Sequence, residues 1–272
     1  MPLLGLSDVQ LYWEQTGSGS PVVFVNGIMM SARSWRPQVE AIGARFRCIN
    51  YDLRGQLMSG KPAGDYRFER HTADLLALFD ALDLRQAHLV GISYGGAVGQ
   101  LFAARHPERV RSLSLIATTA ESGAEHRRRF QHWLSVLATQ PRELFSHSLR
   151  QNYSAAYVGS HSAELERMAD WFREREADYF EGLQRLVPAI RDVNLRDDLA
   201  SIQCPSLVLT AADDALVGAE PGRRIAAAIA GAELQEICGG HAITIERPRE
   251  VNAALLNFIE RQEKRRGQDQ KV

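Results

Sequence analysis

Short apolar runs alternate with amphipathic segments through the first half of the chain. The continuous apolar run at residues 22–25 is typical of a strand that is covered on both faces of a sheet, and residues 88–92 fit a further strand. Apolar residues at helical spacing, most regularly at Leu75, Leu78, Phe79 and Leu82, predict helices between them. Further strands are expected at 9–13, 46–50 and 113–116, and further helices at 35–42 and 96–105. Such short alternation predicts a parallel sheet with helices on both faces.

The pattern changes at residues 121–198, where strand-like runs give way to charged residues, aromatic residues and helix formers. Alternation then resumes, with strands expected at 206–210 and 234–238, a helix at 222–230 and a last helix after Pro248. We therefore expect one doubly wound, mostly parallel α/β domain, formed by residues 1–120 and 199–260. A helical cap at 121–198 interrupts it, and the polar stretch 261–272 is expected to fray.

Composition narrows the class of protein. The 272 residues carry 32 Lys and Arg against 33 Asp and Glu, so no global positive field favours a nucleic-acid partner. No apolar run approaches the roughly 20 residues of a membrane span and the N-terminus lacks a secretory signal, so we expect a soluble cytoplasmic protein. Cys48, Cys204 and Cys238 form no CxxC pair, and no redox or metal role is expected for them.

The segment Gly91-Ile92-Ser93-Tyr94-Gly95 lies directly between an expected strand and an expected helix. A turn this tight leaves no room for a Cβ two residues before or after the serine, which explains both glycines, and Gly96 gives further room. A serine presented on such a turn has the position of a nucleophile. We therefore predict that Ser93 is the nucleophile of an enzyme.

A serine hydroxyl needs a base, and the base needs an orienting carboxylate. Among eight histidines, His241 is the candidate base, because it follows a predicted strand at the same edge of the sheet as Ser93. Asp213 and Asp214 also lie at this edge; Asp214 is favoured because it lies further into the turn, and Asp213 is the alternative. No histidine pair has the spacing of a metal site, so neither a metal nor a cofactor is expected.

Acyl transfer also needs two backbone N–H groups that stabilise the developing oxyanion. Tyr94 follows the serine at the start of a helix and offers one of them. The loop at residues 26–31 follows a strand and offers the other, with Ile28 as the expected donor. The same loop could equally be an ordinary strand-to-helix turn capped by Ser31, and the two roles are compatible.

Together these motifs resemble the α/β-hydrolase superfamily over nearly the whole chain. Asn26-Gly27-Ile28 corresponds to the family's His-Gly-x loop, residues 52–59 to its Asp-x-Arg-Gly segment, and Gly240-His241 to its Gly-His. Asn26 replaces the usual histidine, so the hydrogen bonds inside that loop must differ, and Leu57 stands where glycine is common. The resemblance implies an α/β-hydrolase fold with a Ser-His-Asp triad and a backbone oxyanion hole.

Within the superfamily, two segments of the chain resemble two different groups of enzymes. Residues 189–197 are similar to enol-lactonases, and the Asn-Gly of the oxyanion loop is similar to acyltransferases that act on 3-hydroxyacyl thioesters. We expect a serine hydrolase for a small ester, lactone or thioester, whose acyl substrate is free or linked to a carrier or coenzyme A. The alternatives are an acyltransferase, a non-hydrolytic ligand-binding protein and cofactor-free oxygenation or perhydrolysis. The pocket is expected to be lined by Met29, Met30, Trp133, Leu137 and Trp171.

Overall fold

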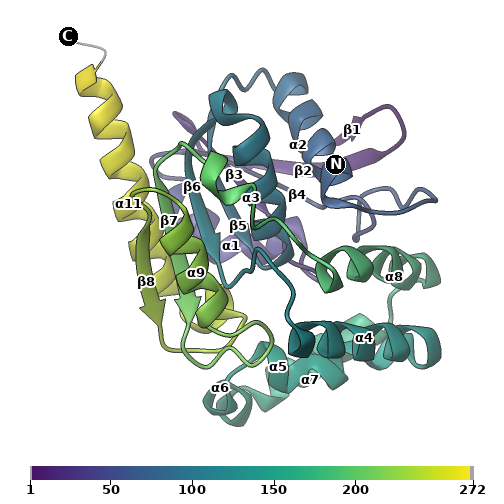
Figure 1. The fold of residues 1–272 in the computed structure, drawn as a ribbon. Helices are drawn as coiled ribbons and strands as arrows, with labels where there is room; N and C mark the ends of the chain where they lie inside the picture. Colours follow the sequence, from purple (N-terminus) through teal and green to yellow (C-terminus); the bar gives the residue numbers. More distant parts are fainter. Residues whose placement is uncertain (1, 270–272) are drawn as a thin grey trace.

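The computed structural model describes residues 2–269, and its centre is an eight-stranded sheet (Figure 1). The strand order is β1-β2-β4-β3-β5-β6-β7-β8. β1, β2 and β4 pair antiparallel, and every pair from β4 through β3 to β8 is parallel. The strands are β1 (Leu3–Gly5), β2 (Gln10–Thr16), β3 (Pro21–Val25), β4 (Arg47–Tyr51), β5 (Ala87–Ile92), β6 (Val110–Ile116), β7 (Ser206–Ala211) and β8 (Glu233–Ile237). The predicted doubly wound, mostly parallel sheet is confirmed.

Helices cover both faces of the sheet, and the side-chain period of two in each strand divides the core accordingly. In β3, Val23 and Val25 pack in one apolar cluster, while Val22 and Phe24 pack in the other. The first cluster is covered by α2 (Phe68–Ala81), α3 (Tyr94–Arg105) and α9 (Glu220–Ala228), and the second by α1 (Arg36–Ile42) and α11 (Pro248–Asp269). Buried on both faces, β3 carries the continuous apolar run seen in the sequence.

A group of helices lies across the carboxyl ends of the parallel strands and outside the sheet (Figure 1). We call this group the cap; it comprises α4 (Ala124–Thr139), α5 (Leu144–Asn152), α6 (Ala155–Ser160), α7 (Ser162–Arg173) and α8 (Ala177–Arg191). A β-bridge between Glu121 and Asn194 brings the two ends of the insertion together. A Cβ at Gly182 in α8 would lie 2.0 Å from the carbonyl oxygen of Gly55, so this glycine lets the cap pack directly on the core.

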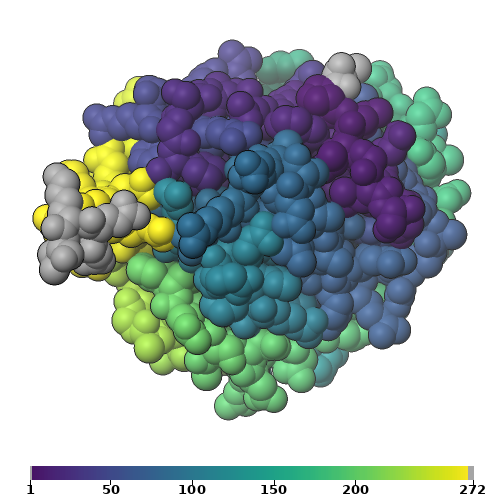
Figure 2. Space-filling model, turned by 90° about the horizontal axis from the view of Figure 1, so that it is seen from above, coloured from purple at the N-terminus to yellow at the C-terminus, as the bar shows by residue number. Residues whose placement is uncertain are grey.

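The C-terminal segment differs from the expectation. Residues 261–269 are helical, since α11 continues to Asp269; the rest of the predicted tail, 270–272, lies outside the described residues. Glu263 explains the difference: its carboxylate contacts Ser20, lies 3.0 Å from His88 Nε2 and accepts a 3.0 Å hydrogen bond from Arg111. Figure 2 views the face away from the cap, where the yellow C-terminal helix adjoins purple and teal segments. β1, a three-residue edge strand, was also not predicted.

The Glu263 contacts predict an acid-sensitive contribution to stability. The hydrogen bond with His88, supported by Ser20 and Arg111, lowers the pKa of Glu263 from 4.5 to about 2. A carboxyl group whose pKa is lower in the folded state stabilises the fold above its unfolded pKa and loses this effect as the pH falls through its folded pKa. We expect the wild-type free energy of unfolding to fall more steeply than that of Glu263→Gln between pH 4.5 and about 2.

Urea titrations across that pH window measure this difference. Burial lowers the pKa of His88 and the contact with Glu263 opposes that shift, so a difference in slope reports the Glu263–His88 pair rather than Glu263 alone. Glu250→Gln, at an exposed position of the same helix, is the control and should keep the wild-type slope. Equal slopes for wild type and Glu263→Gln would contradict the prediction.

None of the helices within 2–269 is both long and apolar enough to cross a membrane.

Candidate active site

Ser93 occupies a strained turn between β5 and α3. Its backbone has φ 53° and ψ −117°, a conformation that residues other than glycine rarely adopt. The Ser93 N–H donates to the carbonyl of Ile116 at 2.8 Å, and the Ser93 carbonyl accepts from Thr118 Oγ1 at 2.7 Å. A Cβ at Gly91 would lie 2.4 Å from a carbonyl oxygen of the turn, and one at Gly95 would lie 2.1 Å from a carbonyl oxygen of β3. Such strain persists only where the surrounding structure fixes it, and it is common at functional sites.

His241 and Asp214 meet at the carboxyl edge of the same sheet. His241 Nδ1 lies 2.8 Å from Asp214 Oδ2, and both side chains are buried. The other oxygen, Oδ1, accepts hydrogen bonds from the backbone N–H groups of Leu216 at 2.9 Å and Val217 at 2.8 Å. Burial alone would raise the pKa of Asp214, but the His241 charge and these hydrogen bonds outweigh it and lower that pKa. Asp213 is exposed, so the structure pairs Asp214 with the imidazole.

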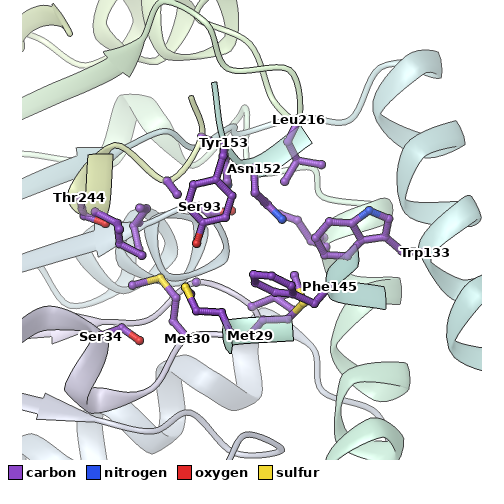
Figure 3. A pocket seen from close by; sticks show the side chains of 18 of the residues that line it. Met29, Met30, Ser34, Ser93, Trp133, Phe145, Asn152, Tyr153, Leu216 and Thr244 are labelled. Atoms are coloured by element: carbon purple, nitrogen blue, oxygen red, sulfur yellow. The ribbon is translucent and has the colours of Figure 1, made fainter. Parts of the chain in front are cut away.

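Ser93 and His241 line one cavity of about 100 Å³ between the sheet edge and the cap. Met29 and Met30 from the core loop and Trp133 from α4 line it too, as expected from the sequence. Figure 3 shows Met29, Met30 and Trp133 around the same space as Ser93. The cavity wall also contains residues that the sequence did not single out: Phe130, Phe145, Asn152, Tyr153, Met168, Ile190, Leu216 and Thr244. Most of the wall is apolar, which suits a substrate with an apolar part.

Two expected pocket residues lie elsewhere, and those predictions are corrected. Leu137 is 1% exposed and packs in the apolar core rather than in the cavity wall. Trp171 is 43% exposed on α7, where the Arg175 guanidinium lies 4.1 Å from its ring centre. Trp171 lines a separate surface groove that shares Met29 and Met168 with the cavity. Helical periodicity identified these residues as apolar but did not determine which of them face the serine.

The loop after β3 brings the second expected oxyanion donor beside Ser93. A Cβ at Gly27 would lie 3.6 Å from Ser93 Cβ, so the Gly27–Ile28 backbone passes close to the serine. The Ile28 N–H donates to no other group within the described chain. Tyr94 is the first residue of α3, and its N–H therefore has no partner inside the helix. Both amides thus have capacity for a bound oxygen.

Asn26, which stands where the family usually has a histidine, makes two side-chain hydrogen bonds in this region. Its Oδ1 accepts from Trp35 Nε1 at 2.7 Å, and its Nδ2 donates to the carbonyl of Met30 at 3.5 Å. Gln56, which the sequence did not single out, donates from Nε2 to the carbonyl of Gly27 at 3.1 Å. Met29 adopts a φ of 66°, which is in the left-handed region of the backbone. The Gln56 contact fixes the direction of the Gly27–Ile28 peptide group, which carries the Ile28 N–H.

The segment that corresponds to the family's Asp-x-Arg-Gly pattern is hydrogen-bonded to the loop after β3 and to the residue that follows this loop. Asp52 accepts hydrogen bonds from the N–H groups of Ala32 at 2.6 Å and Met58 at 3.0 Å. Burial raises the pKa of Asp52 to about 6, although these two hydrogen bonds oppose the effect. Leu57 takes a φ of 35°, so a leucine holds the left-handed backbone for which glycine is suited. The segment therefore has a structural role beside the site.

The arrangement contains the kinds of group that acyl transfer requires. It combines a presented hydroxyl, an imidazole oriented by a buried carboxylate, two available amides and an enclosed apolar space. Among residues 2–269, no group of three or more His, Cys, Asp or Glu side chains is placed to hold a metal ion.

Comparisons with known proteins agree with this geometry. The sequence model described as alpha/beta hydrolase fold matches residues 20–248. A proposed carbamate hydrolase, RutD of Azorhizobium caulinodans, is 32% identical over 266 residues, which are 95% of this chain and 98% of that protein. The enol-lactonase from Burkholderia xenovorans LB400 superposes with a TM-score of 0.88 and is 28% identical, over 95% of this chain and 100% of that chain. A proposed non-heme bromoperoxidase, BpoC of Mycobacterium tuberculosis, is 30% identical over 92% of this chain and 98% of that protein. The chain belongs to the α/β-hydrolase family.

Proposed function

We propose that this hydrolase is a serine enzyme in which Ser93, His241 and Asp214 form a catalytic triad. Ser93 Oγ attacks the substrate carbonyl carbon, and its proton passes to His241 and then to the leaving group. Asp214 holds the imidazole, and the amides of Ile28 and Tyr94 bind the oxyanion. Water then attacks the acyl-enzyme, with His241 as the base, and releases the acid. The 2.8 Å contact between His241 and Asp214, beside the strained Ser93 turn, carries this proposal.

The cavity favours a short apolar acyl group in an ester, lactone or thioester. An engineered cavity of about 150 Å³ holds benzene, so a cavity of about 100 Å³ suits an acyl group of a few carbons. Met29, Met30 and Met168 supply flexible thioether walls that adapt to such a group. The surface groove adjoins the cavity, and the flexible side chains of Met29 and Met168 lie between the two spaces. This arrangement is compatible with a carrier-linked substrate.

A small carbamate is the second candidate. The relative RutD is named as a proposed carbamate hydrolase, and it aligns along almost the whole chain. Asn152 lines the cavity and donates from Nδ2 to Ser148 Oγ at 3.0 Å, while its Oδ1 accepts no hydrogen bond from the described residues. An amide oxygen at this position is a suitable acceptor for the N–H of a carbamate. The triad chemistry would be the same.

Fluorophosphonate labelling followed by a substrate panel tests the proposal. We expect the probe to modify Ser93 and turnover to be fastest with short acyl groups among nitrophenyl esters, lactones, acyl thioesters and phenyl carbamates. Product analysis with an added hydroxy acid separates hydrolysis from acyl transfer, since a transferase would form the new ester. A folded protein that binds these compounds but neither reacts with the probe nor turns them over would instead be a ligand-binding protein.

A further inference from the structure

A carboxylate outside the proposed mechanism connects the cap to the loop that carries His241. Glu246 belongs to the short helix α10 (Ile243–Glu246), which follows that loop. Its Oε1 accepts the backbone N–H of Ser154 at 2.8 Å, and its Oε2 accepts the Ser154 hydroxyl at 2.7 Å. Ser154 is the N-cap of α6 and also accepts from the Tyr157 N–H at 3.2 Å. One carboxylate therefore makes two hydrogen bonds across the boundary between core and cap.

The residues on both sides of His241 touch the same part of the cap. A Cβ at Gly240 would lie 2.5 Å from the Ser154 nitrogen and 2.7 Å from Glu246 Oε1. The backbone at Gly240 and the start of α6 are therefore in close contact, with no room for a side chain at position 240. On the other side, the Ala242 N–H donates to the Asn152 carbonyl at 2.8 Å. Asn152 and Tyr153, just before Ser154, line the catalytic cavity (Figure 3). The residues before and after His241 therefore both contact the cap, Gly240 by close packing and Ala242 by a backbone hydrogen bond.

The cap also contacts the loop that carries the acid. Arg129 in α4 donates from Nη1 to the carbonyl of Leu216 at 2.8 Å. The N–H of that same Leu216 donates to Asp214 Oδ1 at 2.9 Å. Two members of the proposed triad are therefore fixed on loops that are hydrogen-bonded to the cap, whereas Ser93 is fixed by the sheet.

We propose that Glu246 is a positioning residue that couples the placement of the cap to the orientation of His241. The inference rests on the proposed serine-hydrolase function. Without the carboxylate, α10 loses both hydrogen bonds to Ser154, and the His241 segment keeps the Ala242–Asn152 backbone hydrogen bond as its contact with the cap, so the imidazole shifts relative to Ser93. A misplacement of about 1 Å at a reacting group costs on the order of 10²-fold in rate. We expect Glu246→Ala to lower kcat by about 10- to 100-fold, with a change in KM of less than about threefold.

The experiment compares Glu246→Ala, Glu246→Gln and Glu250→Ala in the full chain. Glutamine can still accept the Ser154 N–H through its oxygen, and its amide can donate to the Ser154 hydroxyl, so it should keep more than about one third of wild-type kcat. Glu250 is exposed on α11 and serves as the matched control, with wild-type kinetics expected. The measurements are kcat and KM on the best substrate of the panel, the rate of fluorophosphonate labelling, and the melting temperature.

A fall in kcat for alanine with rescue by glutamine supports the positioning role. Wild-type kcat and labelling rate in Glu246→Ala, even with a lower melting temperature, would overturn it, as would equal losses for alanine and glutamine. If the alanine variant does not fold, Ser154→Ala replaces it; that variant keeps the N–H contact, and a fall in kcat of about three- to tenfold is expected. Absence of both turnover and labelling in the wild type would instead overturn the hydrolase proposal, and this inference with it.

Discussion

Ser93→Ala should lower kcat for any ester that the enzyme turns over by about 10⁵- to 10⁶-fold, and fluorophosphonate labelling should disappear. The loss is this large because the members of a triad act as a unit, and without the hydroxyl only substrate binding and the oxyanion donors remain. Single-turnover and steady-state rates of purified protein measure the effect. KM, where it is measurable, should change little, since the substitution leaves the apolar cavity wall intact.

Two further variants separate this chemical effect from a folding effect. Ser114→Ala removes a buried hydroxyl on the adjacent strand β6 that has no hydrogen-bond partner within the described chain, and it should keep wild-type kcat. Ser93→Gly is as inactive as Ser93→Ala, but it relieves the backbone strain at φ 53° and should be more stable than Ser93→Ala by about 1 kcal/mol. Residual activity of Ser93→Ala above a few per cent would mean that another group is the nucleophile.

The central strands of the fold could be predicted because burial on both faces makes their sequences largely apolar, most clearly at residues 22–25 of β3. The observed β3 (Pro21–Val25) and β5 (Ala87–Ile92) differ from the expected bounds by one residue at their N-terminal ends. The end of α11 could not be predicted in this way, since its last turns carry mostly polar residues. Residues 261–269 are helical in contact with Ser20 and Arg111, which are distant in sequence, and no local pattern reports such contacts.

In the candidate site too, some residues could be predicted from the local sequence pattern and others could not. Ser93, His241 and Asp214 were predictable, because parallel strands end at one edge and the residues that follow them must meet there. The cap wall was predicted only in part, because helix rotation decides whether an apolar residue such as Leu137 faces the cavity or the core. Glu246 gave no signal at all, since its partner Ser154 is a cap residue brought to it by the tertiary fold alone.

Asp214→Asn should lower kcat by about 10⁴-fold while the protein stays folded. Asn can keep its oxygen toward the N–H groups of Leu216 and Val217, and its NH₂ then faces His241 Nδ1. Nδ1 must then accept that hydrogen bond, so the imidazole proton moves to the other nitrogen, which can no longer take the proton of the serine. The measurement is kcat on the best substrate of the panel, together with the melting temperature.

Asp213→Asn is the matched control, because Asp213 is the adjacent aspartate and is exposed. Its side chain makes no hydrogen bond to His241 within the described chain, whereas its backbone N–H, which asparagine retains, donates to the Gly239 carbonyl at 2.9 Å. We expect its kcat to stay within about twofold of wild type.

If Asp213→Asn showed the large loss and Asp214→Asn did not, the acid loop would have to reorganise during turnover so that Asp213 faces the imidazole. If neither substitution slowed turnover, the His241–Asp214 contact would be structural, and the general base would have to act without a carboxylate partner.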